Sequence, residues 1–257
     1  MIELNRQGRR WTVTLNRAEK ANALSLAMLT RLHEVFSQAA QDRELRVLVV
    51  TGAGRRVFSA GADLGEARDA TAITTHPIWE RTSSRLANLP CLTIAALNGT
   101  VAGGGFGLAL ACDLRLAVPE ARFFYPVLKN GFLPQPSDVR RLRALIGPAH
   151  CKTILLGGQK LSADQALAVG LIERIVPRTE MADTIDAFSE AALNADPAVL
   201  VAIKRMIQSD RLSAELHADC VAAVHDRDPA ALARLLPPQG DADTGTRGTG
   251  KQSTGRG

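Results

Sequence analysis

Two glycine-rich segments contain the residue types best suited to chemistry in this sequence. The first runs from Phe58 to Leu64 around Gly61, and the second runs from Ala96 to Gly105 and ends in three successive glycines. A backbone without Cβ atoms can approach a ligand closely, and N–H groups at a helix start bind anions or a developing oxyanion. The same pattern suits a turn followed by a tightly packed helix, so both interpretations remain open.

Metal, disulfide and zinc chemistry have little support in the sequence. The four cysteines lie far apart and form no CxxC pair, which argues against a disulfide framework or a zinc ribbon. His217 and His225 are spaced to share one face of a helix, but no third ligand accompanies them. We therefore expect no metal site.

The elements that must position the glycine segments alternate between strands and helices. Short β-branched or apolar runs predict strands, and helical spacing after Ser25 and the glycine run predict helices, so the first part of the chain is a mixed α/β core. The predicted strands cover 10–16, 46–51, 91–97 and 114–118, and the helices 25–40 and 104–112. The later part is largely helical, with a segment from 139 that ends at 147–148, one that opens at 162, and others over 181–193, 197–207 and 213–225.

Composition and charge exclude several other functions. The 257 residues carry a net charge of only +5 without a basic stripe, and aromatic residues make up 4%, so we expect no nucleic-acid partner. The N-terminus lacks the apolar region of a signal peptide, which favours a cytoplasmic location. The uncharged stretch 86–112 is broken by Pro90, by the Asn98-Gly99 turn signal and by the glycine run, so we expect no membrane span.

Further motifs, taken together with the glycine segments, resemble the crotonase superfamily, also called the enoyl-CoA hydratase/isomerase family. The segment 16–24 is similar to the "RPxxxNAL" motif of that family, and Cys112-Asp113 resembles its "CD" after the glycine helix. The stretch 161–172 resembles its "ltAeeAlaiGLvn" pattern. The resemblance covers roughly residues 2 to 225, and the motifs are specific in combination.

The resemblance implies an α/β fold, a crotonase-like spiral of ββα repeats with a C-terminal helical region that mediates trimerisation. We place the spiral core at 1–195, the helical region at 196–236 and a disordered tail at 237–257. The implied partners are an acyl-CoA thioester and further copies of the chain, as a homotrimer or a dimer of trimers. The implied oxyanion hole consists of the backbone N–H groups of Ala62 and Gly104. The coenzyme A of the substrate, with no separate cofactor, is expected along Lys20, Ala21, Leu24, Ala60, Ala62, Asp63, Leu64 and Gly104.

Two departures from the family pattern bear on the reaction. Where the hydratases of the family carry glutamates, this chain has Gly107 and Val127. Because hydration needs positioned acid–base groups, we expect ordinary hydratase activity to be weak or absent. Tyr125 and Asp138 are the alternative catalytic candidates, although a core aromatic and a carboxylate in the first turn of a helix explain these two residues better. His76 and Trp79 fall in the segment that covers the acyl group in relatives.

Two functions remain after this comparison, and the sequence does not choose between them. The first is a lyase or isomerase that acts on an acyl-CoA thioester through an enolate held in the oxyanion hole. The second is a protein that binds or carries acyl-CoA without turnover, favoured by the loss of both carboxylates to the small apolar pair Gly107 and Val127. Neither the acyl chain nor the reaction follows from the sequence.

Overall fold

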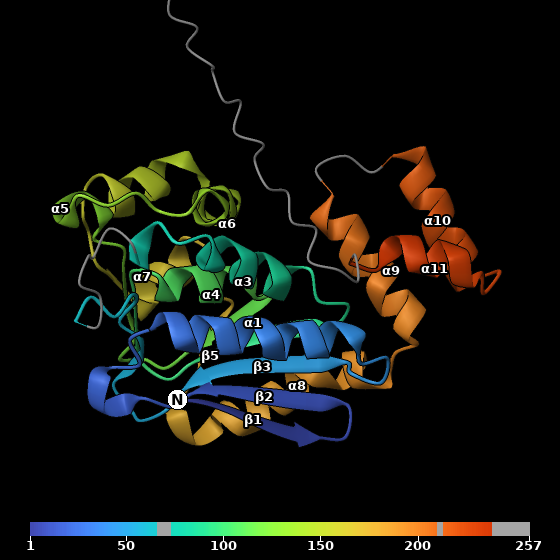
Figure 1. Ribbon diagram of the computed structural model, residues 1–257, viewed down its shortest axis with the longest axis horizontal. Coiled ribbons are helices and arrows are strands. Elements are labelled where there is room, and N and C mark those ends of the chain that lie inside the picture. The colour runs from blue at the N-terminus through green and yellow to red at the C-terminus, as the bar shows by residue number, and fades with distance from the viewer. Residues whose placement is uncertain (66–72, 210–212, 238–257) are drawn as a thin grey trace, which may run out of the picture.

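The computed structural model describes residues 1–65, 73–209 and 213–237, in which strands and helices alternate and then give way to helices (Figure 1). The expected disordered tail, apart from Pro237, lies outside the described residues. The strands are β1 (Ile2–Gln7), β2 (Arg10–Leu15), β3 (Val47–Gly52), β4 (Val57–Ser59), β5 (Leu92–Leu97), β6 (Thr100–Ala102), β7 (Leu114–Ala117), β8 (Arg122–Phe124), β9 (Leu161–Ser162) and β10 (Arg174–Ile175). The helices are α1 (Leu26–Gln41), α3 (Ile78–Ala87), α4 (Gly105–Ala111), α5 (Val127–Asn130), α6 (Pro136–Leu155), α7 (Ala163–Ala168), α8 (Met181–Asn194), α9 (Pro197–Gln208), α10 (Ala214–Val224) and α11 (Pro229–Leu235), with short 3-10 turns at Ala18–Lys20 and Arg178–Glu180.

The strands form two sheets, and successive strands from β3 to β8 alternate between them. The larger sheet has the order β1-β2-β3-β5-β7-β10, and the smaller has the order β4-β6-β8-β9. Three successive repeats each place one strand in the larger sheet, the next strand in the smaller sheet, and then a helix: β3-β4-α3, β5-β6-α4 and β7-β8-α5. This is the expected spiral of ββα repeats, and it confirms the predicted fold class.

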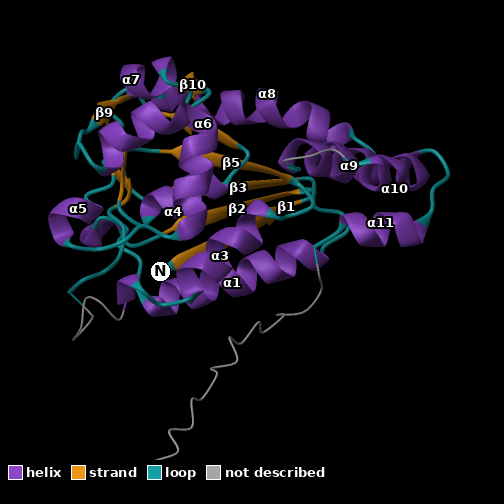
Figure 2. Cartoon of the chain, turned by 90° about the horizontal axis from the view of Figure 1, so that it is seen from above, coloured by secondary structure: helices purple, strands orange, loops and turns teal. Residues whose placement is uncertain are grey.

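Helices cover both faces of the larger sheet. On one side α1, α3, α4 and α6 contact one another in sequence, and on the other side α8 packs on β3 and β5 (Figure 2). Helix α1 begins where predicted, because the Ser25 side chain accepts a hydrogen bond from the Met28 N–H. Strand β3 is buried on both faces, as expected of a parallel strand between helical layers.

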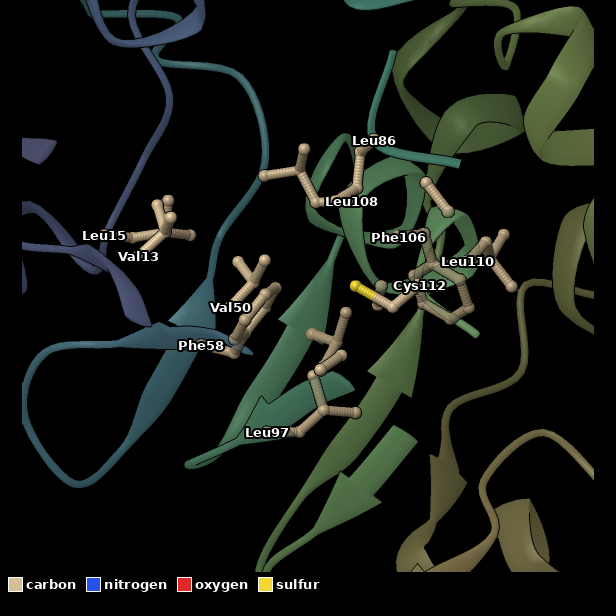
Figure 3. Close-up of a cluster of buried hydrophobic side chains, with 14 of the residues drawn as sticks. Val13, Leu15, Val50, Phe58, Leu86, Leu97, Phe106, Leu108, Leu110 and Cys112 are labelled. Atoms are coloured by element: carbon tan, nitrogen blue, oxygen red, sulfur yellow. The ribbon is translucent and has the colours of Figure 1, made fainter. Parts of the chain in front are cut away.

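The main core lies between the strands and α4. Figure 3 shows Phe106, Leu108 and Leu110 of α4 beside Val50 of β3 and Leu97 of β5. All of these side chains are buried. The glycine-rich start of α4 is thus held against the sheet by aliphatic and aromatic packing, which fixes the backbone of residues 103–105.

The C-terminal helices α9, α10 and α11 surround a separate small core that contains Val201, Cys220 and Leu235. They stand beside the rest of the molecule in Figure 1. Contacts of α9 join them to the spiral: Lys204 Nζ donates to the carbonyl oxygen of Cys91 and to Asp113 Oδ2, at 2.8 and 2.7 Å, and Leu200 packs against the larger sheet.

The expected break at Gly147-Pro148 is present, but the sequence analysis did not predict the helical segment that follows it. Helix α6 is interrupted by a kink at Gly147 and then continues to Leu155. Gly147 has φ +70 and ψ 168, and Pro148 then starts a second helical segment, a position that proline tolerates because its N–H is not needed there. The uncharged stretch 86–112 divides into β5, β6 and α4, and none of the helices among the described residues is long and apolar enough to cross a membrane.

Candidate functional site

The smaller sheet brings three chain segments to one edge. Strands β4, β6 and β8 run parallel, with Ser59 paired to Val101 and Val101 paired to Phe123. Carboxyl ends of parallel strands lie at the same edge of a sheet, where ligands commonly bind in α/β folds. The segments that follow these ends are 60–64, 103–104 and 125–127. Both glycine segments of the sequence therefore meet a third segment that contains Tyr125.

The two glycine segments touch each other through their backbones. Gly61 has φ +93, and a Cβ atom added there would lie 2.8 Å from the Gly104 nitrogen. Only glycine permits this approach. The N–H groups of Ala62 and Gly104 donate to no acceptor within the described ranges, which leaves both available to a ligand. This is the arrangement that an oxyanion hole requires.

A pocket of about 90 Å³ lies against these two amides. Trp79 covers its inner side: a Cβ at Gly104 would lie 2.5 Å from the Trp79 ring, and the indole Nε1 donates to the Ile73 carbonyl at 2.7 Å. The walls are mostly apolar, as is usual for small-molecule sites. The lining residues are Ala60, Ala62, Leu64, Thr74, Trp79, Gly103, Gly104, Tyr125, Pro126, Val127, Asn130, Phe132, Leu133 and Gln135.

The segment 21–24 supports the first glycine segment from behind. The Ala60 N–H donates to the Ala21 carbonyl, and the Leu24 N–H donates to the Gly61 carbonyl, at 3.0 and 2.7 Å. Leu24 is fully buried, so only its backbone takes part in this arrangement. Asp63 is buried too and pairs with Arg17 at 2.5 Å. Leu24 and Asp63, which were expected along coenzyme A, therefore make contacts within the protein that fix the loop.

Two buried amide side chains tie the turns around this loop together. Asn22 Nδ2 donates to the carbonyl oxygens of Ala53 and Val57, at 3.0 and 2.9 Å. Asn98 Nδ2 donates to the Gly54 and Val57 oxygens, and Asn98 Oδ1 accepts from Gly52 N–H at 3.1 Å. Lys20, Ala60 and Leu64 are exposed around the same loop, on the side open to solvent.

Tyr125 and Asp138 form a buried hydrogen-bonded pair at the opposite wall. The Tyr125 hydroxyl donates to Asp138 Oδ2 at 2.9 Å, and both residues are at least nine-tenths buried. Burial raises the pKa of the Asp138 carboxyl to about 6, although the Tyr125 hydrogen bond and the charge of Arg141 lower it. Burial also raises the pKa of the Tyr125 hydroxyl well above 10. At neutral pH a neutral phenol thus faces a mostly ionised carboxylate.

The structure places the other sequence candidates around this pair. Val127 lines the pocket, and Gly107 on α4 faces Asp138. His76 is exposed and outside the pocket lining, where its Nδ1 accepts from the Ile78 N–H at 3.1 Å. Within the described ranges no cluster of histidine, cysteine and acidic side chains could hold a metal ion.

The sequence interpretation missed part of the pocket wall. Thr74, Phe132 and Leu133 line it, beside Gln135, whose Nε2 donates to the Thr74 carbonyl at 2.9 Å. These residues come from two loops that are distant along the chain, and no local pattern links them. The one available signal in the sequence was the apolar pair Phe132-Leu133 after Gly131.

Comparisons with known proteins identify relatives of the whole chain and of its fold. The profile of the family described as enoyl-CoA hydratase/isomerase matches residues 9–224. Carnitinyl-CoA dehydratase from Escherichia coli (strain K12) is 34% identical over 213 residues, which cover 81% of this chain and 80% of the relative. An enoyl-CoA hydratase structure from Bacillus anthracis has a TM-score of 0.81 at 28% identity and covers 91% and 94% of the two chains. An enoyl-CoA hydratase/carnithine racemase structure from Magnetospirillum magneticum has a TM-score of 0.79 at 30% identity, with 89% of each chain covered.

Proposed function

Because the chain belongs to the enoyl-CoA hydratase/isomerase family, we propose that it binds an acyl-CoA thioester and stabilises the enolate of that thioester. The observation that carries this proposal is the pair of unengaged N–H groups of Ala62 and Gly104 at the pocket wall. Both amides are fixed before a ligand arrives, one by the contact of Gly61 with Gly104 and the other by the pairing of Leu24 with residues 61–63. Fixed donors of this kind stabilise a charge that develops on the thioester oxygen.

We place coenzyme A along the solvent side of the same loop. The exposed residues Lys20, Ala60 and Leu64 border the pocket mouth, and Ala21 forms the backbone turn beside them with φ +51. Lys20 supplies a positive charge for a phosphate group. The Leu24 and Asp63 side chains act indirectly, because they are buried and hold the loop.

Ordinary hydration of an enoyl thioester is not the reaction that we propose. Neither Gly107 nor Val127 offers a group that can deprotonate water, and the pocket wall at Val127 is apolar. The chemistry is instead proton transfer at the carbon next to the thioester carbonyl, as in an isomerase or a lyase. The loss of acidic groups at these two positions also favours a second function, an acyl-CoA carrier without turnover.

We further propose that residues 1–195 form the catalytic spiral and that residues 196–236 mediate assembly into a trimer or a dimer of trimers. The separate core of α9, α10 and α11 supports this division. Sedimentation of the full chain tests the assembly, and a monomer at micromolar concentration would contradict it.

The test of the function is calorimetric titration with acetyl-, butyryl-, crotonyl- and octanoyl-CoA, followed by mass spectrometry of each ligand. We expect binding of the thioesters and weaker binding of a thioether analogue that lacks the carbonyl oxygen. Equal affinity for both would contradict an oxyanion hole. Hydration of crotonyl-CoA at a rate typical of enzymes, on the order of 10 per second, would overturn the assignment of Gly107 and Val127.

A further inference from the structure

The Tyr125 and Asp138 pair spans the distance between the pocket and helix α6. Tyr125 follows β8 and lines the pocket, and its ring stacks on Phe106 with centroids 5.6 Å apart. Asp138 lies in the first turn of α6 and does not line the pocket. A proton that leaves the pocket at the Tyr125 oxygen therefore has a defined acceptor behind it, Asp138 Oδ2 at 2.9 Å.

Asp138 occupies space that a side chain on α4 would otherwise fill. A Cβ atom at Gly107 would lie 3.0 Å from Asp138 Oδ1 and 3.2 Å from Oδ2. Such contacts are too close for a larger side chain without movement of the carboxylate. Because Gly107 has no side chain, α4 leaves room for the Asp138 carboxylate of α6. The two residues are complementary in this sense.

The Asp138 carboxylate is buried with only one of its two oxygens hydrogen-bonded within the described ranges. Asp138 Oδ1 has no hydrogen-bond partner among the described residues. The charged groups that face Asp138 are Glu80 of α3 and Arg141 of α6, and neither bonds to it: Glu80 accepts from Ser137 Oγ at 2.8 Å, and Arg141 donates to Ser83 and Ser137. A buried ionisable group that retains one open acceptor is costly to fold, and such groups concentrate at functional sites.

On the premise that the pocket binds an acyl-CoA thioester, we propose that Tyr125 and Asp138 form the proton relay of the site, with Asp138 positioned in the space left by Gly107. In this relay Tyr125 is the catalytic residue, since it lines the pocket, and Asp138 acts through it. The relay replaces a carboxylate that would reach the pocket directly from α4.

The relay balances without a further reactant. The Cα–H bond of the acyl group breaks, and its electron pair enters the enolate, whose oxygen is held by the N–H groups of Ala62 and Gly104. The proton passes to the Tyr125 oxygen while the hydroxyl proton of Tyr125 passes to Asp138 Oδ2. The reverse steps return a proton to the same carbon or, in an unsaturated chain, to a carbon further along. The relay needs Asp138 ionised at the start and Tyr125 neutral.

Exchange of the Cα hydrogens of butyryl-CoA in D2O, followed by mass spectrometry, measures this step alone. We expect wild-type protein to exchange them and both Tyr125→Phe and Asp138→Asn to lower the rate by ~100-fold or more, the scale of a positioned acid–base group, with the dissociation constant of butyryl-CoA nearly unchanged. The wild-type rate should rise with pH through the Asp138 pKa of about 6 and then level off. Asp138→Glu should retain a pH inflection, whereas Asp138→Asn should show none.

Moving the carboxylate back to α4 tests the complementarity. Gly107→Glu alone should perturb the site, because its side chain meets Asp138, whereas Gly107→Glu combined with Asp138→Gly has room for the new side chain. We expect the double variant to exchange at least ~10-fold faster than Asp138→Gly alone. Circular dichroism of each variant identifies any that fail to fold. If Gly107→Glu alone does not fold, the comparison of the double variant with Asp138→Gly still tests the complementarity.

The outcomes separate this relay from the proposed function. Exchange that is unaffected by Tyr125→Phe and Asp138→Asn would overturn the relay and leave the oxyanion hole in place. Tight butyryl-CoA binding with no exchange by wild-type protein would overturn the relay and identify a carrier. A failure of wild-type protein to bind any acyl-CoA would instead contradict the proposed function itself and remove the premise of the relay.

Discussion

The pocket has two walls that are built in different ways. The amide wall, residues 60–64 and 103–104, presents backbone N–H groups, and its shape depends on glycines and on backbone contacts. The side-chain wall, Tyr125, Val127 and Asp138, presents a hydroxyl backed by a carboxylate, and its shape depends on how α4 meets α6. In our proposals the first wall stabilises negative charge on oxygen and the second moves a proton. The difference teaches that charge stabilisation and proton transfer can vary separately within one pocket.

The amide wall should be the more sensitive of the two to a single added methyl group. We expect Gly61→Ala to lower the rate of butyryl-CoA exchange by ~100- to 1000-fold, the loss typical of one oxyanion donor. The reason is steric, because the added Cβ would lie 2.8 Å from the Gly104 nitrogen at a φ of +93. Isotope exchange in D2O is the measurement.

Gly8→Ala is the matched control for this change. Gly8 also has positive φ, at +55, but an added Cβ there meets no atom within 4 Å. It therefore reproduces the backbone strain without the contact at the site. Similar losses of exchange in both variants would show that strain alone, and not the geometry of the amide wall, explains the effect.

The amide wall also depends on buried side chains that hold its turns. We expect Asn22→Ala to lower the free energy of unfolding by about 3 kcal/mol, because it removes one donor from the half-buried Ala53 and Val57 carbonyls and puts alanine at positive φ. Denaturant titration measures the change. The exposed Asn194, which bonds only to Glu190 in its own helix, provides a control whose replacement by Ala should cost less than about 1 kcal/mol. Equal costs at both positions would contradict this role of Asn22.

The two walls also differ in how far the sequence predicted them. The amide wall follows from local signals, since Gly61 and the run 103–105 indicate a close backbone approach and α4 starts at Gly105 as expected within one residue. Most of the described helices, and the strands β2, β3, β5 and β7, followed from periodicity and caps for the same reason, whereas the short strands of the smaller sheet were not predicted. Such features depend on residues that are neighbours in the chain.

The side-chain wall was only partly predictable, because it depends on contacts between distant segments. A carboxylate at the third position of a helix is typical of an exposed residue that favours the helix dipole, and Asp138 does lie in that first turn. Its burial results from the contact of α6 with α4 at Gly107, which lies 31 positions earlier in the chain. The helical segment after Gly147 was not predicted for a related reason: glycine and proline together correctly indicate a break, but they do not reveal that a second helical segment follows at once.

The burial of Asp138 in the side-chain wall also predicts a pH dependence of stability. Burial raises the folded-state pKa of Asp138 from 3.8 to about 6, so between these values the folded protein binds more protons than the unfolded chain. Stability from this group is therefore present at low pH and lost as pH rises through 6. We expect Asp138→Asn to gain about 2 kcal/mol relative to wild type between pH 4 and pH 7.5, measured by urea titration at each pH. A constant difference between the two proteins across this range would contradict the shifted pKa.

The smallest expected effect lies at the rim of the amide wall. We expect Lys20→Ala to raise the dissociation constant of butyryl-CoA about 2- to 5-fold, since an exposed ion pair contributes at most about 1 kcal/mol. The effect of Lys20→Ala on the dissociation constant should become smaller as salt rises from about 20 to about 300 mM, because salt screens the exposed charges. The exchange rate of bound ligand should not change. Lys152→Ala, an exposed lysine of α6 outside the pocket lining, is the matched control. If Lys20→Ala lowered the exchange rate of bound ligand and left its affinity unchanged, Lys20 would act on the geometry of the amides rather than on a phosphate, and the rim would belong to the charge-stabilising wall.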